Sequence, residues 1–187
     1  MKLYYFTKKN HAIDSLTNKT LKIATIDTLN DPYEFFVTFK NGDKQLEGST
    51  IDTMKENYSK VMGFLCFSSK NYDPVQWAHY ADNHCGMCME FDVSDALPVK
   101  IKYQNNPIEI DISNRKWKDL FIESTITKYQ HWSYEREFRV SIKLKDKAVK
   151  EVNGLYFIPY SDELILRKLY AGVRCQCYPR KVDIIYS

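Results

Sequence analysis

The sequence predicts an α+β protein: a single domain with a mostly antiparallel central sheet flanked by helices. Its 187 residues are the length of one ordinary domain, and a chain of that length buries about 70% of the surface that it exposes when unfolded. No repeat, low-complexity tract or Pro/Gly/Ser-rich linker divides the sequence. Segments with strand periodicity and segments with helix periodicity alternate irregularly, which is typical of the α+β class. We therefore treat residues 1–187 as one domain.

The chain opens with the pattern of a β-α-β unit. A strand is predicted over 2–6, a helix over 11–18 opened by Asn10, and a second strand over 20–26. Residues 30–34, with the sequence N-D-P-Y-E, read as a loop, because Asn and Asp favour turns and Pro has no amide hydrogen for a strand ladder.

The middle of the chain alternates helix and strand. Apolar residues at helical spacing predict an amphipathic helix over 50–62, and 63–68 reads as a buried strand. A further helix begins at Asp73, which is followed by Pro at the first helical position. We expect Gly86 to end that helix, and 87–92 to resume strand alternation.

The last third carries the clearest strand pattern. A strand near 99–103 and a helix over 114–127 precede it. From Tyr134 to Leu144 the apolar and polar residues alternate almost without a break, which predicts one strand with an apolar face and a polar face. Further strand-like runs follow at 154–158, 168–173 and 182–186.

Composition narrows the function classes. The 27 Lys and Arg exceed the 24 Asp and Glu by 3, without a dominant basic run, so a broad phosphate-backbone footprint is not indicated. The 14 Tyr, 10 Phe and 3 Trp suit a core, and Tyr and Trp also suit stacking on a ligand. Residues 1–7 lack the apolar stretch of a signal peptide, and no segment approaches the ~20 apolar residues of a membrane span. We expect a cytoplasmic protein with no membrane partner.

The candidate catalytic residues are Glu135, Glu137 and Arg139, which the predicted strand places on one side. Two close carboxylates can be split by their environment into an ionised group that stabilises positive charge and a group of raised pKa that moves a proton. The alternative is a solvated strand face whose charges pair across strands. The spacing alone leaves both interpretations open.

A second group of candidates lies on the short helix. There Trp77, Tyr80 and His84 come near one another, with His79 on the adjacent flank. His can act as a base or donate to a phosphate, and the rings can stack on a base or on nicotinamide. The alternative is core packing by Trp77 and a capping role for His84 or Asn83.

The cysteines are predicted to be reduced and metal-free. Five cysteines in a chain without an export signal argue against a disulfide framework. The spacing of Cys85, Cys88, Cys175 and Cys177 does not form the paired knuckles of a structural zinc site. We therefore expect no metal.

Three motifs in order carry a family resemblance: N-D-P-Y-E at 30–34, W-A-H-Y-A-D-N-H-C-G at 77–86 and W-S-Y-E-R-E-F-R at 132–139. Together they resemble a bacterial family catalogued as domain of unknown function twenty-nine seventy-one, over nearly the whole chain. That family brings no established reaction.

A second resemblance, to the ADP-ribosyltransferases, implies a mechanism. The β-α-β opening, a strand that ends at Ser68 and a later strand with Glu-x-Glu look similar to their three-part pattern, without its first-strand Arg or His and its full Ser-Thr-Ser. The resemblance implies nucleotide contact from the first strand, support from the Ser-ended strand and catalysis by the Glu. The expected cofactor-binding residues are Trp77, His79, Tyr80, Tyr5, Ser68, Asn30 and Asp31.

The resulting hypothesis is an ADP-ribosyltransferase-like toxin or phage-defence effector that cleaves the nicotinamide-ribose bond of NAD. Its expected partners are a nucleotide-type small molecule, a protein or nucleic-acid acceptor and a cognate antitoxin. The alternative is a non-catalytic ligand-binding or regulatory domain, in which the Glu, Arg, His and Trp cluster is a structural network.

Overall fold

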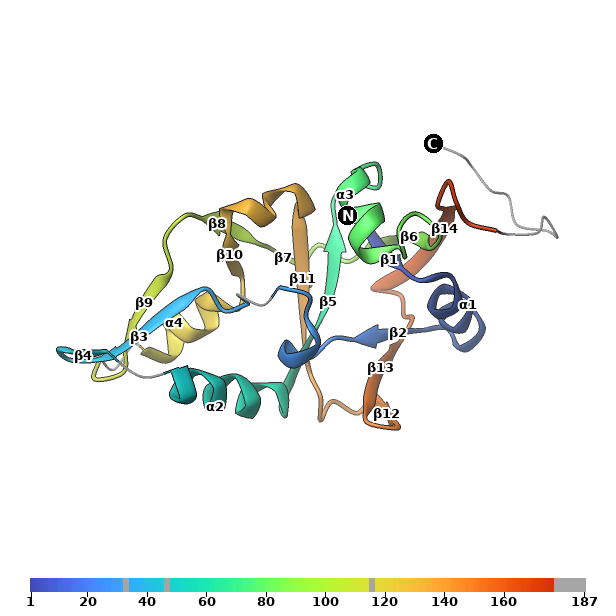
Figure 1. Cartoon of the computed structure of the whole chain (residues 1–187). Helices are drawn as coiled ribbons and strands as arrows, with labels where there is room; N and C mark the ends of the chain where they lie inside the picture. Colours follow the sequence, from blue (N-terminus) through green and yellow to red (C-terminus); the bar gives the residue numbers. More distant parts are fainter. Residues whose placement is uncertain (32–33, 46–47, 115–116, 177–187) are drawn as a thin grey trace.

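A six-stranded antiparallel sheet with the strand order β14-β6-β1-β5-β11-β7 organises the chain (Figure 1). This computed structural model describes residues 1–31, 34–45, 48–114 and 117–176. The strands of the main sheet are β1 (Lys2–Thr7), β5 (Met62–Ser68), β6 (Met87–Val93), β7 (Val99–Lys100), β11 (Glu137–Lys143) and β14 (Leu164–Ala171). The architecture is α+β, as the irregular alternation predicts.

Three small sheets accompany the main one. They contain β2 (Thr20–Ile23), β12 (Lys150–Val152) and β13 (Leu155–Pro159); β3 (Val37–Asn41), β4 (Lys44–Gln45) and β9 (Ile108–Asp111); and β8 (Lys102–Gln104) with β10 (Thr127–Tyr129). The helices are α1 (Lys9–Asn18), α2 (Gly48–Ser59), α3 (Pro74–Tyr80) and α4 (Trp117–Ser124), with 3-10 turns η1 (Ile26–Thr28) and η2 (Gln130–Glu135). Figure 1 shows β3, β4, β9 and α4 on one side of the β5–β11 pair, and α1, β2, β12 and β13 on the other.

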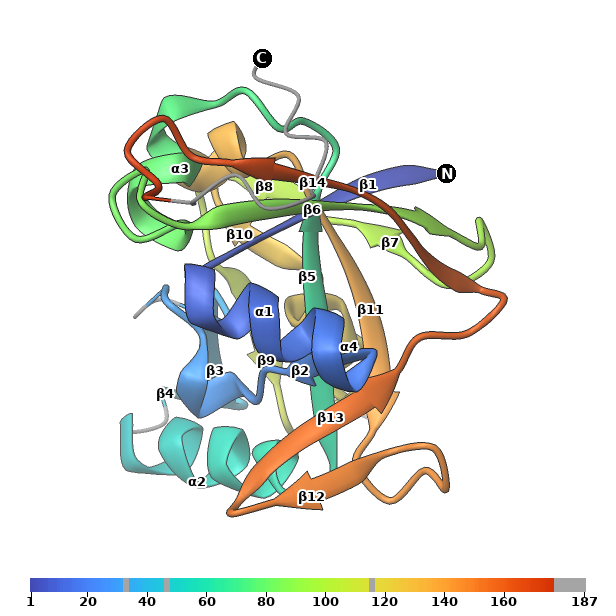
Figure 2. The ribbon, with the colours of Figure 1, turned by 90° about the vertical axis from the view of Figure 1, so that its right-hand side faces the viewer.

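Two segments that diverge from each other pair with the edge of β5 that faces away from β11. At its end β5 pairs with β1 at Tyr4↔Ser68, and near its start Phe64 exchanges backbone hydrogen bonds of 2.7 and 2.9 Å with Ala24, just after β2. Figure 2 shows β1 running with β6 and β14, while β2 leads away toward β13 and β12. The sheet therefore opens between β1 and β2, along the middle of β5.

The apolar core fills one face of β5 and β11. Leu65 and Phe67 of β5 and Val140 and Ile142 of β11 pack there with Ala12 of α1. Residues of opposite parity, such as Ser68 and its register partner Glu137, point to the other face. That second face is also buried near the start of β11, since Glu137 and Arg139 are enclosed.

The main correction to the sequence analysis concerns residues 134–136. We predicted one strand from Tyr134, but the strand begins at Glu137, and Tyr134 and Glu135 belong to η2. Arg136 has a φ of 46°, in the left-handed region, so neither helix nor strand continues through it. The Glu135 carbonyl accepts hydrogen bonds from Ser68 Oγ (2.8 Å) and Gln76 Nε2 (2.5 Å), which fix the turn.

Other element boundaries also differ from the prediction. The strand expected over 20–26 ends at Ile23, because Thr25 and Thr28 form a capping box around η1. The helix expected over 114–127 is shorter, and Thr127 already belongs to β10. The strand expected at 182–186 lies outside the described residues. Within the described ranges, no helix has the length and apolar character needed to cross a membrane.

Candidate functional site

A cavity of about 230 Å³ lies where the sheet opens between β1 and β2. Its wall comes from β1, β2, β5, α3, β10, β11 and the segment around η1, so segments far apart in the sequence meet there. The lining residues are Tyr4, Tyr5, Phe6, Lys22, Ala24, Thr28, Leu29, Asn30, Glu34, Phe64, Cys66, Phe67, Ser68, Gln76, Tyr80, Lys128, Glu135, Glu137 and Arg139.

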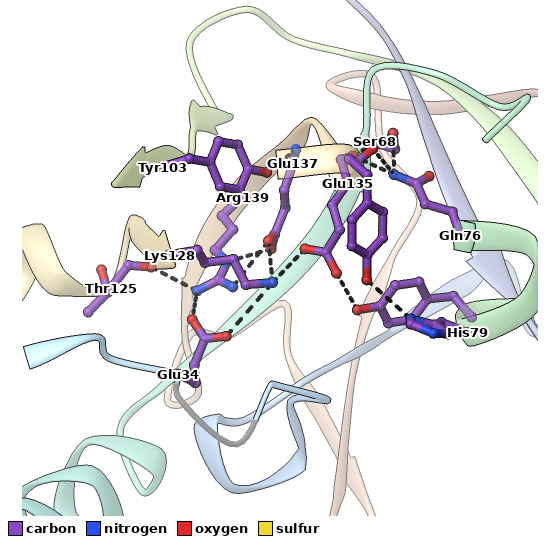
Figure 3. A network of polar contacts seen from close by, with 12 residues as sticks. Glu34, Ser68, Gln76, His79, Tyr103, Thr125, Lys128, Glu135, Glu137 and Arg139 are labelled. Atoms are coloured by element: carbon purple, nitrogen blue, oxygen red, sulfur yellow. Dashed lines mark hydrogen bonds and ion pairs between the residues drawn. The ribbon is translucent and has the colours of Figure 1, made fainter. Parts of the chain in front are cut away.

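Arg139 anchors the charged wall of this cavity (Figure 3). Its Nε donates to Glu137 Oε1 at 2.5 Å, and its Nη1 donates to Glu34 Oε1 at 2.5 Å and to the Thr125 carbonyl at 2.8 Å. Its Nη2 contacts Glu137 Oε2 at 3.3 Å. The Arg139 side chain is only 1% exposed, and its guanidinium group donates its hydrogen bonds to protein groups.

Lys128 links the remaining carboxylates. Its ammonium donates to Glu135 Oε2 at 2.6 Å and to Glu137 Oε2 at 2.9 Å, and it lies 4.0 Å from Glu34 Oε2. Trp132 lies beside it, with the ammonium 5.2 Å from the ring centroid. Glu34, Lys128, Glu135, Glu137 and Arg139 are each buried, and we call these five residues the buried charge cluster.

The buried charge cluster is not electrically balanced. Its three carboxylates face two cations, so the cluster carries one net negative charge whenever all three carboxylates are ionised. Burial would raise the pKa of Glu137, but Arg139 and Lys128 hold it well below its usual range. Burial raises the pKa of Glu135 to about 7, although Lys128 and Tyr80 oppose the shift. One carboxylate therefore stays ionised while its neighbour titrates near neutrality.

Two residues of α3 complete the wall. The Tyr80 hydroxyl donates to Glu135 Oε1. Gln76 is 2% exposed, and its Nε2 donates to Ser68 Oγ at 3.1 Å and to the Glu135 carbonyl. Its Oε1 is buried and accepts no hydrogen bond from any residue in the described part of the chain.

The structure brings together most, but not all, of the predicted site residues. Glu135, Glu137, Arg139, Tyr80, Tyr5, Ser68 and Asn30 all line the cavity. Trp77 does not; it packs on Phe6 with ring centroids 5.2 Å apart, as the core alternative anticipates. His79 lies at the surface beside Tyr134, and its Nδ1 is 3.1 Å from that hydroxyl. Asp31 lines a separate, open hollow.

The charged face of β11 also differs from the solvated alternative. Charges pair there, as that alternative expects, but within a buried cluster.

Sequence reasoning did not select Lys128, Glu34, Gln76 or Thr125. Glu34 stands in the N-D-P-Y-E motif, which is the signal that could have found it. Lys128 follows the apolar run of α4. Its position could have been predicted only with knowledge that β10 pairs with β8. Gln76 lies in the first turn of α3, and its amide reaches across to η2.

Among the cysteines that the structure describes, only Cys66 lines the cavity. Burial raises the pKa of the Cys66 thiol, so it stays protonated. Cys66, Cys85 and Cys88 are free thiols, and Cys177 lies outside the described residues. No group of three or more His, Cys, Asp or Glu side chains arranged to hold a metal occurs among the residues described.

Comparison with known proteins gives one match. Residues 76–140 match the family described as Protein of unknown function (DUF2971), which the three motifs resemble. The motifs at 77–86 and 132–139 lie within the match, and N-D-P-Y-E at 30–34 lies outside it, so the match covers about a third of the chain rather than nearly all of it. The match covers α3, β6, η2 and the start of β11, and therefore includes Lys128, Glu135, Glu137 and Arg139. No curated protein and no solved structure matches the chain.

Proposed function

We propose that the cavity binds NAD, a nucleotide-type small molecule, and that the protein cleaves its nicotinamide-ribose bond. The observation that carries this proposal is the unbalanced negative charge of the buried charge cluster on the cavity wall. Positive charge develops on the ribose as nicotinamide departs, and fixed carboxylates in a water-poor site stabilise such charge strongly.

The arrangement of the strands supports the same proposal. The ADP-ribosyltransferase-like pattern assigns nucleotide contact to the first strand, support to the Ser-ended strand and catalysis to the Glu-bearing strand. In the main sheet these strands are β1, β5 and β11, which are consecutive neighbours. Ser68 and Glu137 are register partners, so the support and the carboxylate stand side by side.

The two glutamates divide the work by their environments. Glu137 stays ionised and supplies the fixed charge that stabilises the oxocarbenium-like ribose. Glu135, with its pKa near 7, orients the acceptor and takes its proton. Arg139 holds Glu137 and Glu34 in place rather than a phosphate, because its bound groups are all protein groups and it is enclosed.

The physiological setting follows from this chemistry as part of the proposal. We propose that the protein, by consuming NAD or transferring ADP-ribose to a protein or nucleic acid, acts as a toxin or phage-defence effector that a cognate antitoxin holds in check. Tyr80 and the first-strand residue Tyr5 lie on the wall where such a nucleotide would bind.

The burial of Glu137 inside the buried charge cluster favours a second function. Both oxygens of Glu137 contact cations, and the residue is only 4% exposed. In a non-catalytic ligand-binding or regulatory domain, the same contacts would tie β11, β10 and the Glu34 segment together. The cavity would then bind a ligand without changing it.

Substitution of the two glutamates tests the proposal. With NAD as substrate and nicotinamide release as the readout, Glu137→Gln should lower turnover on the order of a hundredfold or more. Glu135→Gln should slow transfer to an acceptor more than simple hydrolysis. Glu90→Gln is the matched control, since Glu90 is a buried glutamate outside the cavity lining.

The melting temperature of each variant is measured alongside. A wild-type protein that binds NAD without releasing nicotinamide supports the binding domain instead. Activity that survives Glu137→Gln at the wild-type level contradicts the assigned role.

A further inference from the structure

We propose that the outer side of η2, together with the loop between β5 and α3, binds single-stranded nucleic acid through aromatic rings and two cations. The inference rests on six residues, which we call the aromatic surface: Lys70, Tyr72, His79, Trp132, Tyr134 and Arg136. Binding at this surface goes beyond the proposed function and does not depend on the cleavage of NAD.

Tyr72 is the most open ring of the aromatic surface. It is 61% exposed, and every other Phe, Trp and Tyr whose side chain the structure describes is buried or half-buried. The Lys70 ammonium lies 5.9 Å from its ring centroid, and the Arg136 guanidinium carbon lies 6.0 Å from it. A ring so open contributes little to the core. It offers a face on which a base can stack, beside cations that can contact a phosphate.

Three more rings form a contiguous group. The His79 ring contacts the rings of Trp132 and Tyr134 edge-on, with centroids 6.4 and 6.1 Å away, and the Trp132 and Tyr134 centroids are 6.0 Å apart. The His79 Nδ1 lies 3.1 Å from the Tyr134 hydroxyl, which links α3 to η2 at the surface. Rings held in place by their neighbours can stack on a ligand with little loss of side-chain entropy.

A backbone contact joins Tyr72 to this group. The Ser69 amide donates to the Arg136 carbonyl at 3.2 Å, so the loop between β5 and α3 lies against the joint between η2 and β11. Tyr134 and Arg136 flank Glu135 in the chain, and Glu135 is buried whereas Arg136 is exposed. The turn therefore directs Glu135 to the cavity and Arg136 to the outside.

The charge of the aromatic surface is positive. It is formed by residues 69–72, 77–80 and 130–136. The charged side chains in these segments are Lys70, Glu135 and Arg136, and of these Glu135 is buried. Asp73 borders the surface, where it caps α3 by accepting from the Val75 amide. Two cations with no exposed carboxylate among them complement the phosphates of a nucleic acid.

A single strand fits this surface better than a duplex or an acidic peptide. The net charge of the whole chain is only +3, and the surface has two cations, so phosphate contacts alone would bind weakly. The bases of a single strand are free to stack on protein rings, whereas those of a duplex are stacked on one another. An acidic peptide would use the cations and leave the rings without a partner.

The aromatic surface adjoins the cavity. Tyr80 lines the cavity, and its ring centroid lies 6.1 Å from that of His79. A strand bound across His79 would therefore pass beside the cavity wall. If the proposed function holds, that strand is the acceptor nearest to Glu135, and this corollary alone rests on the proposed function.

Fluorescence anisotropy of the full chain with labelled oligonucleotides tests the inference in the absence of NAD. The probes are oligothymidylate and oligouridylate of about 10 nucleotides, and the oligothymidylate paired with its complement. The single strands should bind at least about tenfold tighter than the duplex. Two phosphate contacts should give a slope of about −1.4 for the logarithm of the association constant against that of the salt concentration. The tighter of the two strands identifies DNA or RNA as the ligand.

Variants assign the binding to the aromatic surface. Tyr72→Ala removes an exposed stacking ring and should weaken binding at least about fivefold. Lys70→Gln should make the salt slope shallower by about 0.7, because it removes one phosphate contact. The matched control is Lys150→Gln, an exposed lysine on β12, which Figure 1 shows at the opposite end of the molecule from α3; it should change neither quantity.

The melting temperature of each variant is measured alongside, and the comparison of strand with duplex uses the wild-type chain, so it stands even if a variant fails to fold. Equal affinity for strand and duplex, unchanged binding by Tyr72→Ala, or no binding at millimolar strand overturns the inference. Oligoglutamate that binds as tightly as the strands would identify an acidic peptide as the partner and also overturns it.

The failures of the two proposals are distinguishable. If the strand binds as expected but NAD is not cleaved, the aromatic surface stands and the proposed reaction is wrong. If NAD is cleaved and no strand binds, the reaction stands and this inference is wrong.

Discussion

Two buried glutamates, Glu90 and Glu135, make almost the same side-chain contacts, but their pKa values shift in opposite directions. Each is at most 5% exposed, accepts a hydrogen bond from a tyrosine hydroxyl and contacts a lysine ammonium. The pKa of Glu90 is lowered, because Tyr170 and Lys2 outweigh the effect of burial, whereas burial raises the pKa of Glu135 to about 7.

The difference lies in the surroundings of each pair. Lys2 forms an ion pair with Glu90. The Lys2 side chain is half exposed, so the charge of that pair is partly solvated. Lys128 is enclosed and is shared between Glu135 and Glu137, with Glu34 4.0 Å away. Burial and a tyrosine contact are common to both glutamates, so they do not distinguish the candidate site. The distinguishing feature is an excess of carboxylates over cations beside a cavity.

The largest expected effect is on stability, from removing the central cation. Arg139→Met leaves Glu137 and Glu34 without their shared partner in a buried site, and should lower the free energy of unfolding by about 3–5 kcal/mol. Chemical denaturation measures it. Lys2→Met removes the lysine of the other pair and should cost far less, because that side chain is solvated. Equal costs would show that the buried charge cluster is not a connected network.

The pH dependence of stability should have opposite signs at the two glutamates. Glu135 has a raised pKa in the folded protein, so its contribution is intact below its unfolded pKa and is lost as pH rises toward about 7. Glu90 has a lowered pKa, so its contribution is present above its unfolded pKa and is lost as pH falls. The groups that face Glu135 are Tyr80 on α3, Lys128 on β10, and Glu137 and Arg139 on β11, with Glu34 across the cluster.

The measurement is the melting temperature of each Glu→Gln variant minus that of the wild type, from pH 4 to pH 8. The difference for Glu135→Gln should become more favourable as pH rises, and the difference for Glu90→Gln should become less favourable. Subtraction cancels the titration of distant groups. Parallel curves would contradict the comparison.

The smallest expected effect comes from the two tyrosine hydroxyls. Tyr80→Phe removes a hydrogen bond that lowers the pKa of Glu135, so this pKa should rise further and the free energy of unfolding should fall by about 1.5–3 kcal/mol. Tyr170→Phe removes the 2.5 Å bond to Glu90 and should raise the lowered pKa of that glutamate toward its usual value. The pH dependence of the melting temperature reports both shifts. A pKa of Glu135 that does not move would mean that Tyr80 is not its partner in solution.

The sequence was informative where local rules dominate. Alternation located β1, β5 and β6, and the Asp73-Pro74 start of α3 is confirmed by the bond from the Val75 amide to the Asp73 carboxylate. Glu135 and Glu137 were expected to lie close together, and the lysine that contacts both of them confirms this placement.

The sequence was uninformative where distant segments decide. Glu34 and Arg139 are 105 positions apart, and no local periodicity reveals that pair. The start of β11 was misplaced because the Glu135 carbonyl is fixed by Ser68 and Gln76, which are remote in the chain. Trp77 and His79 share a motif with Tyr80, but the helix turns only Tyr80 toward the cavity.

Arg136 shows how a residue outside the cavity can set the geometry within it. Its side chain is exposed, yet its left-handed backbone is the joint between η2, which carries Glu135, and β11, which carries Glu137. The left-handed backbone of Arg136 therefore sets the spacing between Glu135 and Glu137. This position requires a left-handed main chain, which Gly, Asn and Asp adopt more readily than other residues.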